Sequence, residues 1–303
     1  MSPRKTLAVI VPCHNETANV APFYETAKKA LESLPLDWSL LFVNDASTDD
    51  TLDRILDLRK SDPRVRVATL SRNFGYHSAL VAGLSNARAD LYAIIDVDGE
   101  DPPELLVKFH EAIAKGAHTA YGIRSQRPEP AHIVFCRWLF YWINQHIADG
   151  PIRLWMAEFS MFTSQVREAI LSNKTTFPFL RAEMAYVGLR MEGVPYTRQP
   201  RLRGTSHYNF WRMSQFAIGG FLASSTFPLR ASLYLSAAFA AVYAVSVAAL
   251  GLSLVEAGAL AAAMGFLFLL ATVPMLALYL ARTYKNVTAR PVFFLDPDRS
   301  RLN

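Results

Sequence analysis

Residues 91–98 read Leu91-Tyr92-Ala93-Ile94-Ile95-Asp96-Val97-Asp98, an apolar run that ends directly in two carboxylates. An unbroken apolar run of this kind is typical of a strand that is buried on both faces of a parallel sheet. Taken as residues 91–95, this strand has counterparts at residues 6–11, 40–43, 65–70 and 119–122. Helical patterns separate them, at residues 19–34, 49–60, 76–87 and 103–115. Strands that alternate with helices predict an α/β domain with a doubly wound parallel sheet.

Polar side chains follow several of these strands where each one ends. The first strand is followed by Pro12-Cys13-His14-Asn15-Glu16 and the second by Asn44-Asp45-Ala46-Ser47. Ligands of doubly wound sheets bind at the carboxyl ends of the strands. We therefore expect the binding site at this edge, together with Asp96 and Asp98.

The pair Asp96 and Asp98 is a candidate site for a divalent cation. Carboxylate oxygens suit Mg²⁺ or Mn²⁺, which proteins usually bind together with substrate phosphates. The following Asp101-Pro102-Pro103-Glu104 has the pattern of a helix start, with Asp101 as N-cap and Glu104 at the third position. These two are therefore expected to be structural, which leaves Glu100 as a third candidate metal ligand.

Two stretches near the C-terminus have the composition of membrane spans. Residues 231–255 and 257–281 contain no charged residue and no histidine, and a helix of about 20 residues crosses a bilayer core. A buried helical hairpin is the alternative, which the interleaved Ala, Gly and Ser residues disfavour. Residues 208–230 are rich in aromatic side chains and are interpreted as an interfacial amphipathic segment, with a core helix as the alternative.

The charges around the two spans predict their orientation. Glu256 is the only charge between them, whereas basic residues flank them at Arg212, Arg230, Arg282, Lys285 and Arg290. The positive-inside rule then places both termini in the cytoplasm, and residues 1–30 show no signal-peptide pattern. We expect an integral protein of the cell membrane with a catalytic domain at residues 1–207, a membrane hairpin at 231–281 and a cytoplasmic tail at 282–303.

Composition narrows the classes of partner. The formal net charge of +5 suits an anionic membrane surface and phosphate substrates, and no nucleic-acid-binding motif accompanies it. Cys13 and Cys136, the only cysteines, are expected to be reduced and structural.

Several motifs together resemble one enzyme family. In chain order they are Val11–Glu16, Val43–Thr51, Ser71-Arg72-Asn73-Phe74-Gly75, the segment Asp96–Glu104 and Tyr121–Arg124. This ordered set is similar to family 2 glycosyltransferases of the Rossmann-like GT-A fold. The two terminal spans and the segment Arg201–Tyr208 resemble the polyprenyl-phosphate glycosyltransferases within that family.

The resemblance implies roles for residues on the donor side. The nucleoside pocket would be lined by Pro12, Asn15, Glu16 and Asp45. A structural role in turns and helix caps is the alternative for these residues. Asp96 would face the ribose or the metal, and Asp98 would bind the metal. Arg124 would hold donor phosphate, although a solvated loop charge is equally consistent with the sequence.

The resemblance also implies an acceptor side close to the membrane. The acceptor phosphate would be bound by Arg127, Arg201, Ser206 and His207, with Arg201 also serving catalysis. The family usually has Gly-Asp-Phe-Arg where this chain has Ala157-Glu158-Phe159-Ser160, so Glu158 would orient the acceptor or act as a weak base. The family also usually has lysine at His207 and glutamine at Glu100.

The resemblance thus implies inverting, metal-dependent transfer of a sugar from a UDP- or GDP-linked donor to undecaprenyl or dolichyl phosphate. One alternative is a processive polysaccharide synthase, but its usual Gln-x-x-Arg-Trp element has Val134 in place of glutamine before Arg137-Trp138. A membrane-tethered nucleotide-sugar binding protein without catalysis is another. The sugar, the lipid length and the oligomeric state, including a homo-oligomer, stay open.

Overall fold

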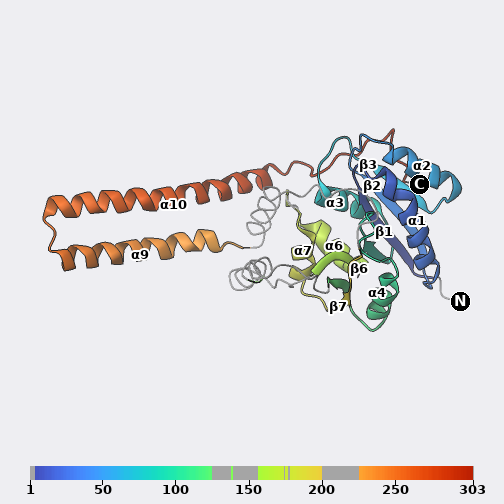
Figure 1. Cartoon of the computed structure of the whole chain (residues 1–303), viewed down its shortest axis with the longest axis horizontal. Coiled ribbons are helices and arrows are strands. Elements are labelled where there is room, and N and C mark those ends of the chain that lie inside the picture. The colour runs from blue at the N-terminus through green and yellow to red at the C-terminus, as the bar shows by residue number, and fades with distance from the viewer. Residues whose placement is uncertain are drawn as a thin grey trace.

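The computed structural model describes residues 4–124, 138, 156–173, 175–176, 178–199 and 225–302. An α/β domain lies at one end of the molecule, and a long helical hairpin projects from it (Figure 1). The sheet has seven strands in the order β3-β2-β1-β4-β6-β5-β7. The strands are β1 Thr6–Cys13, β2 Asp37–Asn44, β3 Val65–Thr69, β4 Leu91–Ile94, β5 Thr119–Arg124, β6 Met156–Thr163 and β7 Met191–Tyr196.

Helices cover both faces of the sheet, as the doubly wound pattern predicts. On one face α1 (Thr17–Glu32), α2 (Thr51–Ser61) and α4 (Leu105–Ala114) pack against side chains such as Val9 and Phe42. On the other face α3 (Tyr76–Asn86), α6 (Ser164–Ser172) and α7 (Leu180–Tyr186) pack against side chains such as Ile10 and Ile94. The five strands and four helices expected from the sequence are all present, with ends that differ by up to three residues.

The sheet differs from the prediction because it is mixed rather than parallel throughout. Strand β6 runs antiparallel to both β4 and β5, whereas β3, β2, β1 and β4 run parallel to one another. The sequence pattern did not reveal β6 because polar residues interrupt its apolar run, yet Glu158 and Ser160 are both buried. Strand β7 lies at the edge, and its Glu192, Gly193 and Pro195 make it a weak strand pattern.

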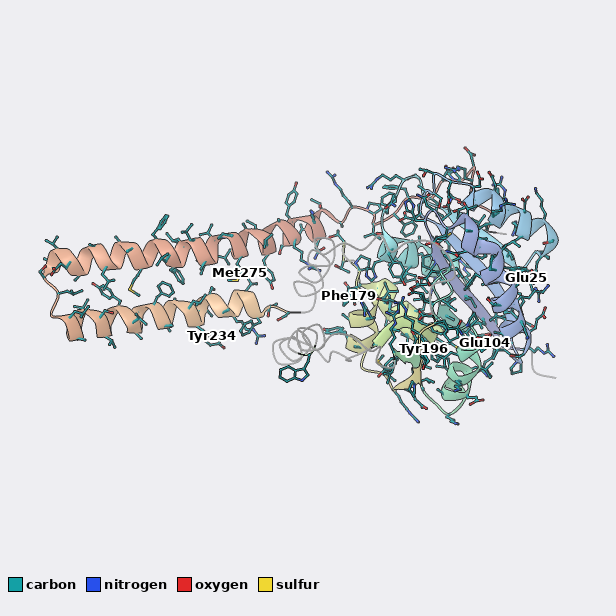
Figure 2. The ribbon with its side chains drawn as sticks, in the orientation of Figure 1. Glu25, Glu104, Phe179, Tyr196, Tyr234 and Met275 are labelled. Atoms are coloured by element: carbon teal, nitrogen blue, oxygen red, sulfur yellow. The ribbon has the colours of Figure 1, made fainter. Side chains whose placement is uncertain are left out.

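The hairpin consists of α9 (Phe227–Leu250) and α10 (Leu254–Thr288). Both helices are long and apolar enough to cross a membrane, over Leu229–Leu250 and Leu254–Thr288. Side chains along their length, among them Tyr234 and Met275, do not enter the core of the α/β domain (Figure 2). Gly251 ends α9 in the left-handed conformation, and Ser253 and Glu256 form a capping box that begins α10.

The helices of the hairpin do not begin and end at the limits predicted for the two spans. Helix α10 continues to Thr288, seven residues beyond the predicted end at 281, and the remaining tail returns to the α/β domain. Residues 208–224 of the predicted interfacial segment lie outside the described residues, and residues 227–230 form the start of α9.

We predict that Gly83→Ala destabilises the domain by about 1–3 kcal/mol, which is typical of an overpacked core. Gly83 on α3 faces the sheet, and an added Cβ would lie 2.4 Å from Ile10 Cγ2 and 2.9 Å from Val43 Cγ2. Both methyl groups belong to β-branched side chains with little freedom to move. Thermal unfolding of the purified chain, followed by circular dichroism, measures the effect.

Ser85→Ala is the matched control, because Ser85 lies on the same helix and is exposed. A midpoint for Gly83→Ala equal to that of Ser85→Ala would contradict the close packing of α3 on the sheet.

Candidate active site

The loops after β1 and β2 are tied together at the carboxyl edge of the sheet. Asn15 adopts a left-handed backbone conformation with φ of 57°. Its side-chain Oδ1 accepts a hydrogen bond from the backbone N–H of Thr48 at 2.8 Å, and its own N–H donates to Ser47 Oγ at 3.0 Å. Glu16 beside it accepts from the Asn19 side chain at 2.6 Å. The structure therefore brings Asn15 and Glu16 together, next to Pro12 at the end of β1.

Asp45 binds a third loop, residues 71–75, at the same edge of the sheet. Its two carboxylate oxygens accept hydrogen bonds from the backbone N–H groups of Phe74 at 2.7 Å and Gly75 at 2.8 Å. Gly75 has φ of 90°, a conformation that a side chain would strain, at the point where α3 begins. Asp45 thus has a structural role in this arrangement, and its predicted contact with the donor nucleoside stays a prediction.

Asp49 accepts hydrogen bonds at the beginnings of two helices, although the N-cap residue of α2 is Asp50 and that of α1 is Glu16. One carboxylate oxygen accepts from the N–H of Thr51 at 3.1 Å and the other from the N–H of Thr17 at 3.3 Å. These are the first residues of α2 and α1. Ser47 instead bonds to Asn15, as described above.

Asp96 and Asp98 follow β4 as expected and lie in an acidic environment. Asp96 accepts a hydrogen bond from the Tyr76 hydroxyl at 2.8 Å. Burial, followed by the nearby carboxylates of Asp101 and Asp98, raises the pKa of Asp96 to about 7. Asp98 is 6% exposed and accepts from the Glu100 N–H at 3.1 Å.

Asp101 and Glu104 do not start α4 in the way the sequence predicts. The helix begins at Leu105, and no side chain caps it. Asp101 is 1% exposed and accepts a hydrogen bond from the Tyr196 hydroxyl on β7. It also faces the guanidinium of Arg124, with Nη2 at 3.6 Å, and that of Arg198, with Nε at 3.8 Å. The Asp101 carboxylate thus binds these side chains instead of capping α4, and Asp101 lies in the candidate site with them.

Arg124 and Glu100 therefore have protein partners in this structure. Arg124 at the end of β5 pairs with Asp101, and its Nε donates to the Tyr196 hydroxyl at 3.2 Å. Glu100 pairs with Arg198 Nη2. Burial and the Asp101 carboxylate raise the pKa of Tyr196, so its hydroxyl stays protonated as the donor. The predicted contacts of Arg124 with phosphate and of Glu100 with metal stay predictions.

The fit to a divalent cation can be judged from the charges present. Within the described residues, no group of three His, Cys, Asp or Glu side chains is arranged to bind a metal ion. The mutual effect of Asp96, Asp98 and Asp101 on the pKa of Asp96 nevertheless marks a buried region in which negative charge accumulates. That Asp96 and Asp98 supply two oxygen ligands to a cation, with substrate phosphate supplying others, stays a prediction.

Glu158 lies on β6 and is held by an arginine that the sequence analysis did not identify. Its Oε1 lies 2.8 Å from Nε of Arg181 on α7, and Arg181 also donates to the Met156 carbonyl at 3.2 Å. Ser160, two residues further along β6, donates to the Glu158 carbonyl at 2.8 Å. The guanidinium beside Glu158 therefore comes from a different element than the Gly-Asp-Phe-Arg pattern would suggest.

Arg181, Arg198, Tyr196 and Tyr76 were all missed as site residues. The first three lie on or beside α7 and β7, which had no clear sequence pattern, whereas Tyr76 directly follows the Ser71–Gly75 motif and could have been included. The predicted acceptor residues Arg127, Arg201, Ser206 and His207 lie outside the described residues.

Comparison with known proteins relates the chain to one enzyme family. The family model described as glycosyl transferase family 2 matches residues 8–157, which include Asp45, Asp96 and Asp98. A bactoprenol glucosyl transferase of Shigella phage SfV is 32% identical over 231 residues, covering 76% of this chain and 75% of that protein. An uncharacterized glycosyltransferase of Synechocystis is 28% identical over 300 residues, covering 96% of this chain and 94% of that protein.

A solved structure shares the fold. Glucosyl-3-phosphoglycerate synthase from Mycobacterium tuberculosis superposes with a TM-score of 0.52 at 18% identity, covering 72% of this chain and 79% of that one. With the strand order, the carboxylates after β4 and the relatives taken together, this chain is a glycosyltransferase with the GT-A fold and belongs to glycosyltransferase family 2.

Proposed function

We propose that this chain transfers one sugar from a nucleotide-sugar to a polyprenyl phosphate at the cytoplasmic face of the membrane. The observation that carries the proposal is the joining of two features in one chain. A family 2 site with buried carboxylates at the carboxyl edge of the sheet is followed by two helices able to cross a membrane. The names of the phage relatives, which combine a glucosyl group with bactoprenol, support a lipid acceptor.

The proposed sugar transfer does not need a strong general base. A phosphate monoester has a second pKa of about 6, so the acceptor phosphate is largely a dianion at neutral pH. Its oxygen would attack the anomeric carbon while the bond from that carbon to the nucleotide diphosphate breaks. A single in-line displacement inverts the configuration at that carbon. The protein then needs mainly to position the acceptor and to stabilise the departing diphosphate.

Within this scheme the described residues have distinct tasks. Asp96 and Asp98 would hold Mg²⁺ or Mn²⁺, which when bound neutralises negative charge on the diphosphate. Tyr76 orients Asp96 through its hydroxyl, and Arg181 fixes Glu158 in place. Glu158 would orient the acceptor phosphate or the sugar hydroxyls. The acceptor-phosphate roles of Arg127, Arg201, Ser206 and His207 remain part of the proposal.

The proposal is tested by incubating the full chain, purified in detergent, with undecaprenyl phosphate and a panel of UDP- and GDP-sugars. Mass spectrometry should detect polyprenyl phosphate that carries a single sugar. A polymeric product would favour the processive synthase, and donor binding without any product would favour a binding protein. Either result contradicts the proposal.

We predict that Asp98→Asn lowers turnover at least ten-fold, which corresponds to about 1.4 kcal/mol of transition-state stabilisation. The change removes one anionic ligand from the proposed cation site and keeps the size of the side chain. Initial rates at saturating Mn²⁺ measure it. Asp53→Asn, at an exposed position on α2, is the matched control. Full activity of Asp98→Asn, or of the parent chain in excess chelator, would refute the metal-dependent mechanism.

We predict that both termini lie on the cytoplasmic side, because basic residues flank the two spans. Cysteines introduced as Ser2→Cys and Asn303→Cys should resist a membrane-impermeant thiol reagent in intact cells. Leu252→Cys, in the link between α9 and α10, should react with it. Labelling of either terminal site before lysis would show the orientation to be wrong.

A further inference from the structure

The chain does not end at the membrane hairpin but returns along the α/β domain. We call residues 286–302 the C-terminal strap. In Figure 1 it leaves α10 and passes over the α3 side of the domain toward β3 and α2. Phe293, Leu295 and Leu302 from the strap pack against the core cluster on the α3 face of the sheet. The strap is therefore a packed part of the domain.

The strap pairs with the outer edge of the sheet. The N–H of Arg301 donates to the Val67 carbonyl at 2.7 Å, and the N–H of Val67 donates back at 3.0 Å. Further along, the N–H of Asp296 donates to the Thr69 carbonyl at 2.8 Å, and Ser300 Oγ accepts from the Thr69 N–H at 2.9 Å. The strap thus satisfies backbone groups of β3, the edge strand on this side of the sheet.

The same pairing continues into the loop that Asp45 holds. The N–H of Ser71 donates to the Phe294 carbonyl at 2.9 Å. The Phe294 ring lies 6.3 Å from that of Phe74, and the Arg72 guanidinium lies 3.9 Å from the Phe74 ring on its own loop. The N–H of Phe74 is one of the two groups that bind Asp45. The loop 71–75 is therefore fixed from two sides, by Asp45 and by the strap.

The beginning of the strap contacts the connection that leads to α7. Asn286 Oδ1 accepts hydrogen bonds from Thr176, from its N–H at 3.0 Å and its hydroxyl at 2.7 Å. Thr176 lies in the connection from α6 to α7, the helix that supplies Arg181 to Glu158. In Figure 2, Phe179 of the same connection lies on the side of the domain nearest the hairpin.

The length of α10 explains how the strap reaches the domain. Its 35 residues span about 52 Å at 1.5 Å per residue, whereas a bilayer core is about 30 Å thick. The last turns can therefore extend beyond the membrane as continuous helix, with Asn286 among them. A continuous helix then runs from the second span to the connection between α6 and α7.

We propose that the C-terminal strap is a positioning element for the glycosyl donor, in which Phe294 holds the loop 71–75 in its Asp45-bound conformation. The assignment of this loop to the donor side rests on the proposed function. The strap also ties the site to the second span, so the distance between the site and the membrane is fixed by α10 and Asn286 rather than by a loose tail.

The test uses the full chain with Phe294→Ala, and Asp298→Ala as the matched control at an exposed strap position. The Phe294 ring is 55% exposed, so its removal is not expected to unfold the domain. Hydrogen exchange of the Phe74 and Gly75 amides should accelerate at least ten-fold, while the amides of β1 stay protected. Binding of UDP should weaken at least five-fold, and the donor KM should rise with the acceptor KM unchanged.

A second variant that lacks residues 292–303 should show the same selective exchange to a greater degree. Unchanged protection of Phe74 and Gly75 in both variants overturns the proposal. Equal acceleration in β1 and in the loop also overturns it, because the strap would then merely stabilise the fold. Exchange needs no substrate, so failure of the parent chain to bind either UDP or GDP, or to turn over, would count against the proposed function and not against the strap.

Discussion

A buried negative charge, that of Asp101, organises the centre of this enzyme. Removing a carboxylate from water costs several kcal/mol unless partners compensate for the loss of hydration. Asp101 obtains them from Tyr196 on β7, Arg124 on β5 and Arg198 just after β7. Strands β5 and β7 are thereby joined to the segment that follows β4, which carries Asp96 and Asp98. The position of the proposed cation site thus depends on contacts made by strands at the far side of the sheet.

The sequence was sufficient to predict the part of the domain from β1 to β5, because there the hydrophobic pattern of each element matches its burial. Strands β1 to β5 are apolar runs, and the polar residues after them gather at one edge, as parallel strands require. Two apolar helices after the catalytic domain were also correctly predicted. In each of these elements the local sequence pattern agrees with the environment of the element in the structure.

The elements that follow β5 could not be predicted in the same way, because the contacts that hold them in place join buried polar groups. Glu158 and Ser160 lie in the interior of β6, where alternation and apolar runs are both misleading. Asp101 looked like a helix cap, since capping is a local preference, but long-range partners bind it instead. Arg181 reaches Glu158 from a helix that follows it by about twenty residues, and no spacing rule connects the two.

The strap on β3 has a consequence for the order of biosynthesis. Thr69 and Ser300 are separated by 231 positions in the chain, so β3 keeps an open edge until residues 296–301 have been synthesised. An unpaired edge can recruit other strands, and contacts of such long range form slowly. The residues that complete the sheet are therefore synthesised after both helices of the hairpin. A nascent chain arrested within the hairpin would hold an unfinished domain at the membrane surface, which makes this stage a natural point for chaperone binding or proteolysis.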